Sequence, residues 1–354
     1  MTVSTRFTRP GALLLALSTL AACDSSDSVG PAPINTATTD VLVDASASTA
    51  YVRLGDTVRA VTPASPATST EWDLSLFATT VALNSGAGGP GDVQGYCLCG
   101  NENVSNAEIQ TLTAANQRAA FDAVTAAQIP ADNQFSNESL IPRISGWFTG
   151  TGASAAANPA RTFVLLRTRV LPIPLYGKFR VTSLSGATAT SPGTVTIEYT
   201  MQATGAGPLP AARTATITVG SAPVYFDLVN GTTVSAGDTW DIRFEGFLIR
   251  ANSGASGGAG ILVAPPVDAD FATLDLTTLR ATPNRDFGQD ALGGPFGARP
   301  WYKYNVTGTD QQIWPNFNVY LVKKGSQVFK GQLTGYYDAQ GQSRRITVRS
   351  ARLR

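Results

Sequence analysis

Large apolar and polar residues alternate along most of the chain, and this period of two is typical of β-strands with one buried face. The stretch "WDLSLFATTVAL" shows the pattern, because Trp72, Leu74 and Leu76 fall on the same face. Such stretches are short, and turns rich in glycine and proline separate them. The pattern predicts an all-β fold built from antiparallel strands.

One segment has a helical period instead. Residues 105–124, "SNAEIQTLTAANQRAAFDAV", begin with Ser105 followed by Glu108 three positions later, which is the spacing of a capping box. The apolar residues that recur on one side of this segment are Ile109, Leu112, Phe121 and Val124. The segment predicts one helix inserted in the first half of the chain.

The chain also repeats itself. A phrase that starts at Trp72 recurs at Trp240: each begins with Trp-Asp, and in each the tetrapeptide Asn-Ser-Gly-Ala starts twelve residues later. A tyrosine-containing strand precedes each phrase, and similar stretches follow it, so that six markers occur in the same order. Self-similarity of this extent indicates an internal duplication. We therefore predict two tandem antiparallel β-domains, at about residues 39–205 and 211–354.

The residues of the repeated phrase are interpreted as structural. Trp72 and Trp240 are expected to anchor the cores of the two copies rather than to contact a ligand. Short polar side chains hold turns by bonding backbone amides. This role is predicted for Asp73, Asn84, Asp241 and Asn252.

The first residues resemble a bacterial lipoprotein signal. Arg6 and Arg9 precede an apolar run that is too short to span a membrane, and the run ends in Leu-Ala-Ala-Cys at Cys23. The resemblance implies a signal peptide at residues 1–22 and a lipid on Cys23; the alternative is a plain secreted protein. Residues 23–38 lack a hydrophobic period and predict a flexible tether. We expect a protein of the cell envelope, anchored by lipid at the outer membrane or the cell surface.

Composition excludes several classes of function. The 354 residues carry a net charge of +1 without a basic block, which argues against nucleic acid as a partner. The chain has no histidine, so Ser-His-Asp and Cys-His catalysis and the common histidine-containing zinc motifs are impossible. The glycine clusters lack the Lys-Ser/Thr of a phosphate-binding loop. We therefore do not expect an enzyme.

The aligned markers resemble a known family. The tyrosine-containing strand, the Trp-Asp phrase, Asn-Ser-Gly and the closing stretch "VYLVKKGSQVFKGQLTGYYDAQGQSRRITV" are similar to the HmuY family. These are bacterial lipoproteins, and their best-known members are all-β haemophores that bind haem. The resemblance covers nearly all of the second copy and, more loosely, the first. It implies two tandem HmuY-like domains, with haem or a haem protein as a possible partner.

The chain departs from the family at the haem site. The best-characterised members hold haem iron with two histidines and some relatives use methionines, but the mature chain has no histidine and Met201 is its one methionine. No ligand residue of the family is carried over. The residues of this chain that could still ligate iron are Tyr302, Tyr304, Met201, Cys97 and Cys99. The two tyrosines lie beside Trp301, where packing is the alternative role.

The pair Cys97 and Cys99 has three alternative states. Outside the cytoplasm two cysteines normally form a disulfide, and these two have each other as partners. Free thiols are the second alternative. Binding of a metal or of haem is the third, although a tetrahedral metal site would need two further ligands.

Two functions remain open from the sequence. The first is haemophore-like binding of haem, or of another flat hydrophobic ligand, without histidine ligation. The second is a non-catalytic envelope interaction module that has kept the fold and lost the haem site.

Overall fold

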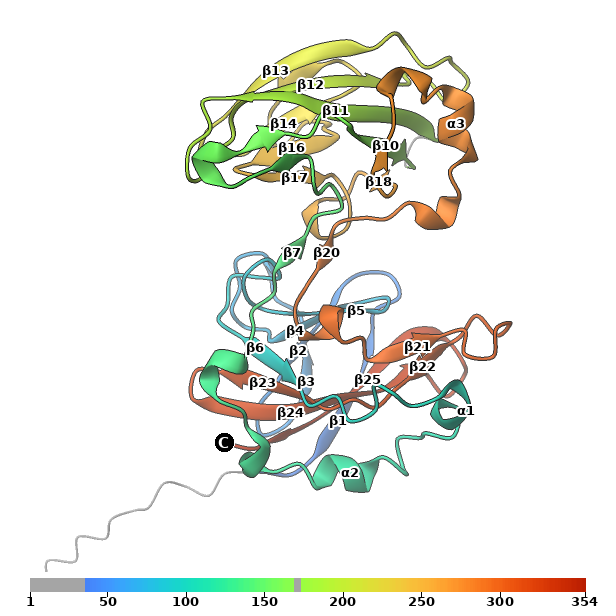
Figure 1. Ribbon diagram of the computed structural model, residues 1–354. Helices are drawn as coiled ribbons and strands as arrows, with labels where there is room; N and C mark the ends of the chain where they lie inside the picture. The colour runs from blue at the N-terminus through green and yellow to red at the C-terminus, as the bar shows by residue number, and fades with distance from the viewer. Residues whose placement is uncertain (1–35, 169–172) are drawn as a thin grey trace, which may run out of the picture. The chain divides into compact units, whose positions relative to one another are not determined.

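The computed structural model describes residues 36–168 and 173–354 (Figure 1). The predicted signal peptide, Cys23 and most of the predicted tether lie outside these residues. The prediction of an all-β fold is confirmed, because antiparallel strands dominate the described part of the chain. Across these ranges no helix has the length and the apolar character that crossing a membrane requires.

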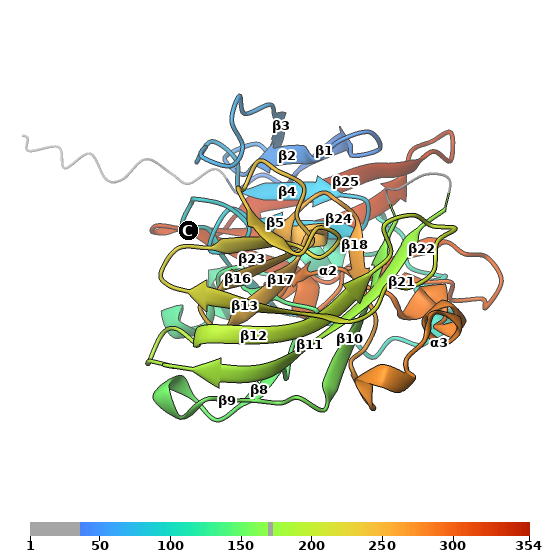
Figure 2. The same cartoon turned by 90° about the horizontal axis from the view of Figure 1, so that it is seen from above.

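The strands form two groups, each with its own hydrophobic core, which we call the continuous lobe and the split lobe. The continuous lobe comprises residues 144–290. Its larger sheet has the order β13-β12-β11-β10-β18, with β19 also paired to β10, and Figure 2 shows β13 to β10 side by side. Its second sheet has the order β15-β14-β16-β17. The strands are β8 (Phe148–Thr149), β9 (Ala156–Ala157), β10 (Arg161–Arg167), β11 (Leu175–Ser185), β12 (Gly193–Met201), β13 (Arg213–Val219), β14 (Val224–Asp227), β15 (Thr232–Val234), β16 (Ile242–Glu245), β17 (Leu248–Ala251), β18 (Ile261–Val263) and β19 (Val267–Asp268).

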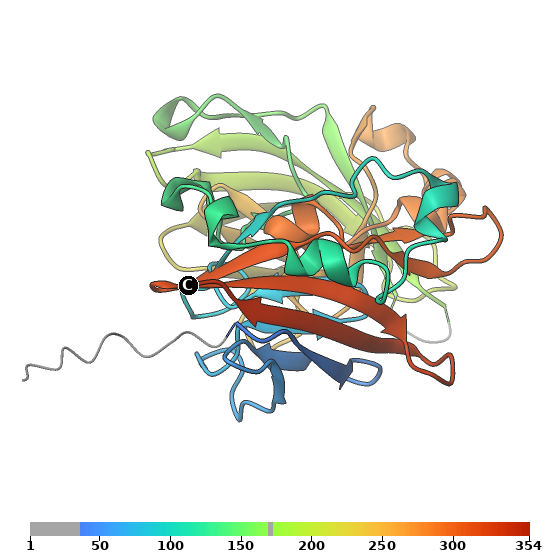
Figure 3. The same ribbon diagram turned by 90° about the horizontal axis from the view of Figure 1, so that it is seen from below.

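The split lobe is formed by two separate segments, residues 39–141 and 291–354. Its larger sheet has the order β1-β25-β24-β23-β6, so that the blue strand from the beginning of the chain lies against the red strands from its end (Figure 3). Its second sheet has the order β3-β2-β4-β5. The strands are β1 (Thr39–Asp44), β2 (Ala50–Arg53), β3 (Arg59–Val61), β4 (Leu74–Phe77), β5 (Thr80–Leu83), β6 (Gln94–Cys97), β7 (Leu140–Ile141), β20 (Ala291–Leu292), β21 (Tyr302–Tyr304), β22 (Ile313–Pro315), β23 (Tyr320–Lys324), β24 (Gln327–Tyr337) and β25 (Ser343–Arg352).

The two lobes have the same strand order. Position by position, β1, β25, β24, β23 and β6 of the split lobe correspond to β13, β12, β11, β10 and β18 of the continuous lobe. Even an irregularity recurs, because the register shifts after Val181 between β11 and β12 and after Leu333 between β24 and β25. Two sheets that share order, pairing and a bulge are expected if one domain has been duplicated.

Each lobe nevertheless takes strands from both copies. Strands β23–β25 come from the second copy and complete the sheet that β1 and β6 of the first copy begin, whereas β10–β12 of the first copy complete the sheet of β13 and β18. The predicted ranges 39–205 and 211–354 therefore describe the sequence repeat and do not describe the folded lobes. The two copies exchange their last three strands, as in a domain-swapped dimer joined into one chain.

The chain crosses between the lobes at β7 and β20, which occupy corresponding places in the two copies. They pair antiparallel, with Leu140 opposite Leu292. Just before each strand lies a buried carboxylate, Glu138 or Asp290. Glu138 accepts hydrogen bonds from the amides of Leu83, at 3.0 Å, and Gly294, at 2.8 Å, so it ties the crossing segment of one copy to the other. Burial raises the pKa of both carboxyl groups.

The predicted single helix at residues 105–124 is wrong. The segment forms two short helices, because Thr113 and Asn116 bond each other's backbone amides, at 2.9 and 3.1 Å, and start a new turn. The capping box of Ser105 and Glu108 is present at the first helix. The second copy also contains helices. The α-helices are α1 (Asn106–Ile109), α2 (Arg118–Asp122), α3 (Leu276–Ala281) and α4 (Pro295–Ala298), and the 3-10 helices are η1 (Ala126–Gln128), η2 (Asp132–Gln134), η3 (Gly152–Ser154), η4 (Gly254–Ser256), η5 (Phe271–Thr273) and η6 (Asn284–Asp286).

Both faces of each larger sheet are covered. One face packs on the four-stranded sheet of the same lobe, and Trp147 and Phe179 are among the residues buried there in the continuous lobe. The other face packs on the helical segment of the same lobe, through Leu274 and Leu279 in the continuous lobe and Val124 in the split lobe. The open cavity and the two buried lysines described below lie on this helical side of the larger sheets.

Candidate functional site

The two tryptophans of the repeated phrase lie in the protein interior. Trp72 is 2% exposed and Trp240 is 6% exposed. Each packs against the tyrosine of the preceding strand, with ring centroids 5.1 Å apart for Tyr51 and Trp72 and also 5.1 Å apart for Tyr225 and Trp240. This placement makes both rings part of the folded framework.

The aspartates that follow these tryptophans bond the backbone and a basic side chain. Asp73 accepts from the amide of Leu54 at 2.8 Å and from the Lys324 ammonium group at 2.7 Å. Asp241 accepts from the amide of Leu228 at 2.8 Å and from the Arg167 guanidinium group. Both ion pairs join one copy to the other, because the basic residues lie at the ends of the exchanged strands β23 and β10.

The asparagines close the loops that contain the glycine clusters. The side-chain amides of Asn84 and Asn252 each donate to the carbonyl oxygen of the preceding tryptophan at 2.9 Å. Their side-chain oxygens accept from the amides of Gly91, at 2.9 Å, and Ala259, at 3.2 Å. The tryptophan, aspartate and asparagine side chains of the phrase therefore hold the fold together.

The two candidate tyrosines lie on the short strand β21. Tyr304 is 57% exposed at the surface. Tyr302 packs against the core of the split lobe, with its ring 5.4 Å from that of Trp301, and lines a cavity of about 550 Å³. Of the two, Tyr302 is therefore better placed to meet a ligand.

The other candidate iron ligands are occupied by the fold. Met201 is 1% exposed in the core of the continuous lobe, where there is no room for a macrocycle. Cys97 and Cys99 form a disulfide with each other, so neither provides a thiolate for iron. In the described ranges, no cluster of three or more His, Cys, Asp or Glu side chains is arranged to hold a metal ion. The donors present do not fit a haem iron that needs two strong ligands.

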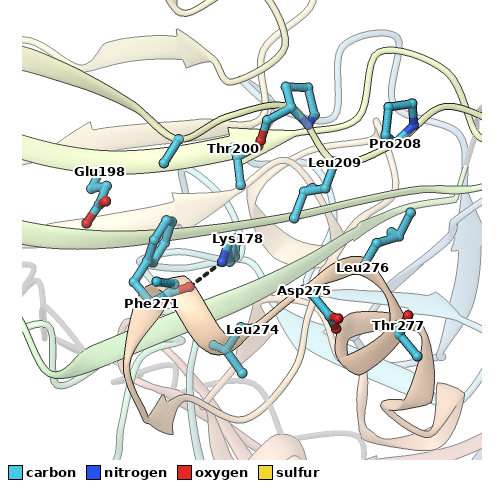
Figure 4. A pocket seen from close by; sticks show the side chains of 13 residues that line it. Lys178, Glu198, Thr200, Pro208, Leu209, Phe271, Leu274, Asp275, Leu276 and Thr277 are labelled. Carbon is cyan, nitrogen blue, oxygen red and sulfur yellow. Dashed lines mark hydrogen bonds between the residues drawn. The ribbon is translucent and has the colours of Figure 1, made fainter.

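An open cavity lies on the helical side of the larger sheet of the continuous lobe (Figure 4). Its volume is about 510 Å³, within the range of roughly 300–1,000 Å³ that small ligands occupy. Strands β11 and β12 form its floor, η5 and the start of α3 form one wall, and the β12–β13 loop with Leu209 forms another. The split lobe has no such loop, because the corresponding strands β25 and β1 are the last and the first of the described chain.

Lys178 on β11 reaches this cavity from the floor. The residue is 4% exposed, and among the described residues the one hydrogen-bond acceptor for its ammonium group is the carbonyl oxygen of Phe271. The Phe271 ring centroid lies 4.2 Å from the Lys178 nitrogen. Burial lowers the pKa of Lys178, and the charge of Glu198 opposes that effect. A lysine ammonium group has three N–H donors, so donors remain for a ligand.

Lys330 is the corresponding residue of the split lobe and is equally buried, at 4% exposure. Its ammonium group donates to three backbone carbonyl oxygens, those of Phe121 at 2.8 Å, Asp122 at 3.2 Å and Val124 at 2.8 Å. The last two residues of helix α2 and the turn that follows it supply these oxygens. The same lysine is therefore fully hydrogen-bonded in one lobe and partly hydrogen-bonded in the other.

The sequence analysis did not single out Lys178 or Lys330. A signal existed, because each lysine interrupts an apolar stretch at the same place in the closing strands, in "LYGKFRV" and in "QVFKGQL". Buried lysines are rare and need partners. The difference between the two lysines depends on α2 and η5, whose ends the sequence did not predict.

No protein-family model matches the chain, and no curated protein matches it.

Proposed function

We propose that this protein is a cell-envelope lipoprotein related to the HmuY family that acts as a non-catalytic binding protein and does not hold haem through its iron. The lipid anchor and the family relationship rest on the sequence, namely on Cys23 and on the repeated phrase. The absence of histidine supports a role without catalysis.

The observation that carries the proposal is the placement of the possible iron ligands. Met201 lies in a core, Cys97 and Cys99 are joined to each other, and Tyr304 stands at the surface. The open cavity above β11 and β12 supports binding of a small molecule at another place.

Haem binding through a tyrosine is the second candidate function. It is favoured by Tyr302, whose side chain lines the cavity of about 550 Å³. Tyrosine ligates haem iron in some proteins, and burial of the macrocycle would add about 25 cal/mol per Å² of apolar surface before the costs of association.

Titration of the purified chain from residue 24 onward with haem tests the proposal. We expect the Soret band to remain that of free haem, because no pair of strong ligands is gathered. A high-spin, tyrosinate-like spectrum that Tyr302→Phe abolishes and Tyr304→Phe preserves would overturn the proposal in favour of the second candidate. A low-spin spectrum would contradict both functions.

A further inference from the structure

The two buried lysines occupy equivalent positions in the two lobes, and they differ in how many hydrogen-bond acceptors surround the ammonium group. In the split lobe, backbone carbonyl oxygens at 2.8 to 3.2 Å surround the Lys330 ammonium group. In the continuous lobe, the Phe271 carbonyl oxygen takes one of these places, and the cavity adjoins the lysine. A ligand that completes the hydrogen bonding of Lys178 would therefore carry the same kind of acceptor.

We propose that this cavity binds a neutral molecule that has an amide-type carbonyl oxygen for Lys178 and an apolar part for the leucines of the cavity wall. The inference rests on the proposed binding function and names its ligand class. The Phe271 carbonyl oxygen accepts from one of the three donors of Lys178, and a carbonyl oxygen of a ligand in hydrogen-bond range would accept from another.

The wall of the cavity suits the apolar part of such a ligand. Leu209 from the β12–β13 loop and Leu276 from α3 are half-buried and line the cavity, and Leu274 lies buried beneath them. Figure 4 shows Leu209 and Leu276 across the cavity from Phe271. Covering their remaining exposed surface would stabilise the complex through the hydrophobic effect.

The charges near Lys178 favour a neutral ligand over a carboxylate. Glu198 lines the cavity and is paired with Arg180 at 2.7 Å. Asp275 also lines it and accepts from the Thr278 amide at the start of α3, at 2.8 Å. The charges that act on Lys178 are those of Glu198, Arg180, Asp270 and Asp275. With Lys178 itself, three acidic groups face two basic groups, so the surroundings of the cavity offset the attraction of Lys178 for an anion.

A matched pair of probes tests the ligand class. N-acetyl-leucine amide and N-acetyl-leucine share the apolar side chain and the acetyl carbonyl, and at pH 7 the first is neutral while the second carries a carboxylate. Each would be titrated into the ¹⁵N-labelled chain, from residue 24 onward, and followed by NMR. We expect the amide to shift the signals of Leu209 and Leu276 and to bind at least about fivefold more tightly than the acid.

Two lysine variants provide the matched comparison. Lys178→Met keeps an unbranched side chain and removes the donors, and we expect it to weaken amide binding about tenfold or more, as for a hydrogen bond to a charged group. Lys330→Met is the control, and it should leave the affinity unchanged. Leu276→Ser keeps Lys178 and should lower the affinity for both probes by the same factor. This variant tests the apolar wall even if Lys178→Met perturbs folding.

The results separate this inference from the proposed function. Tighter binding of the acid, or amide binding that is indifferent to Lys178→Met in a folded variant, would overturn the ligand class. Absence of NMR shifts with both probes would also overturn the ligand class. The haem titration would remain a separate test of the proposed function. A Soret band that depends on Tyr302 would overturn the proposed function whatever the probes show.

Discussion

At the scale of residues, buried charges connect the two copies of the repeat. Asp241 is fully buried, and the Arg167 side chain that it binds is 11% exposed. Arg167 ends β10 of the first copy, whereas Asp241 precedes β16 of the second. The pair therefore forms when the strands have been exchanged, and Lys324 with Asp73 repeats the arrangement in the split lobe.

Removal of one partner of this pair is expected to be costly. Asp241→Asn should lower the free energy of unfolding by about 3–5 kcal/mol, because it leaves the Arg167 charge uncompensated in a buried place. Chemical denaturation measures the loss.

A double-mutant cycle supplies the control for that prediction. In an Arg167→Met background, Asp241→Asn should cost clearly less than it does alone, since no charge is left unpaired. Equal losses in the two backgrounds would show that the ion pair does not couple the copies.

At the scale of elements, the sequence predicted where strands lie in the chain. It did not predict where they end or which strands pair. The period of two located β4 and β16 through Trp72 and Trp240, because a strand with one buried face must alternate. The helix at residues 105–124 was predicted from its apolar spacing, but the bonds between Thr113 and Asn116 compete with that spacing and divide it. A pair of polar residues that bond nearby backbone amides is harder to recognise in a sequence than a regular spacing of apolar residues. The division of the helix was therefore not predicted.

The loop that follows β6 offers a test at this scale. The disulfide between Cys97 and Cys99 closes a loop of three residues, and loop-closure entropy for so short a loop amounts to about 1.5 kcal/mol. Cys97→Ser combined with Cys99→Ser should therefore lower the free energy of unfolding by about that amount and leave the sheets intact. A loss above about 3 kcal/mol in chemical denaturation, or unfolding of β6, would contradict this account of the bridge.

At the scale of the whole molecule, the sequence indicated the duplication but could not indicate the exchange. The strands of the two larger sheets have counterparts in the other copy, and counterparts have similar patterns of burial. Strand β1 could therefore pair with β12 of its own copy or with β25 of the other, and the periodicity is satisfied either way. The choice depends on the path of the chain through β7 and β20, where Leu140 meets Leu292.

The candidate site could be predicted only in part, for the same reason. The sequence alone excluded histidine-based chemistry, because the chain has no histidine. The candidate iron ligands were therefore chosen among its tyrosines, cysteines and methionine. Their burial, and the difference between Lys178 and Lys330, depend on which copy supplies each strand and helix. The exchange of strands is therefore the central structural claim, because both the cores and the open cavity depend on it.

Engineered disulfides in the chain from residue 24 onward, which lacks the lipid-bearing Cys23, test that claim most directly. Leu42 lies opposite Thr347 across β1 and β25, and Thr196 of β12 is the counterpart of Thr347 in the first copy. Residues paired in this way have Cα atoms about 4.5–5.5 Å apart, which suits a disulfide. We expect Leu42→Cys to cross-link with Thr347→Cys, and not with Thr196→Cys, on non-reducing gels and by mass spectrometry. Cross-linking of Leu42→Cys with Thr196→Cys instead would show two tandem domains without exchange.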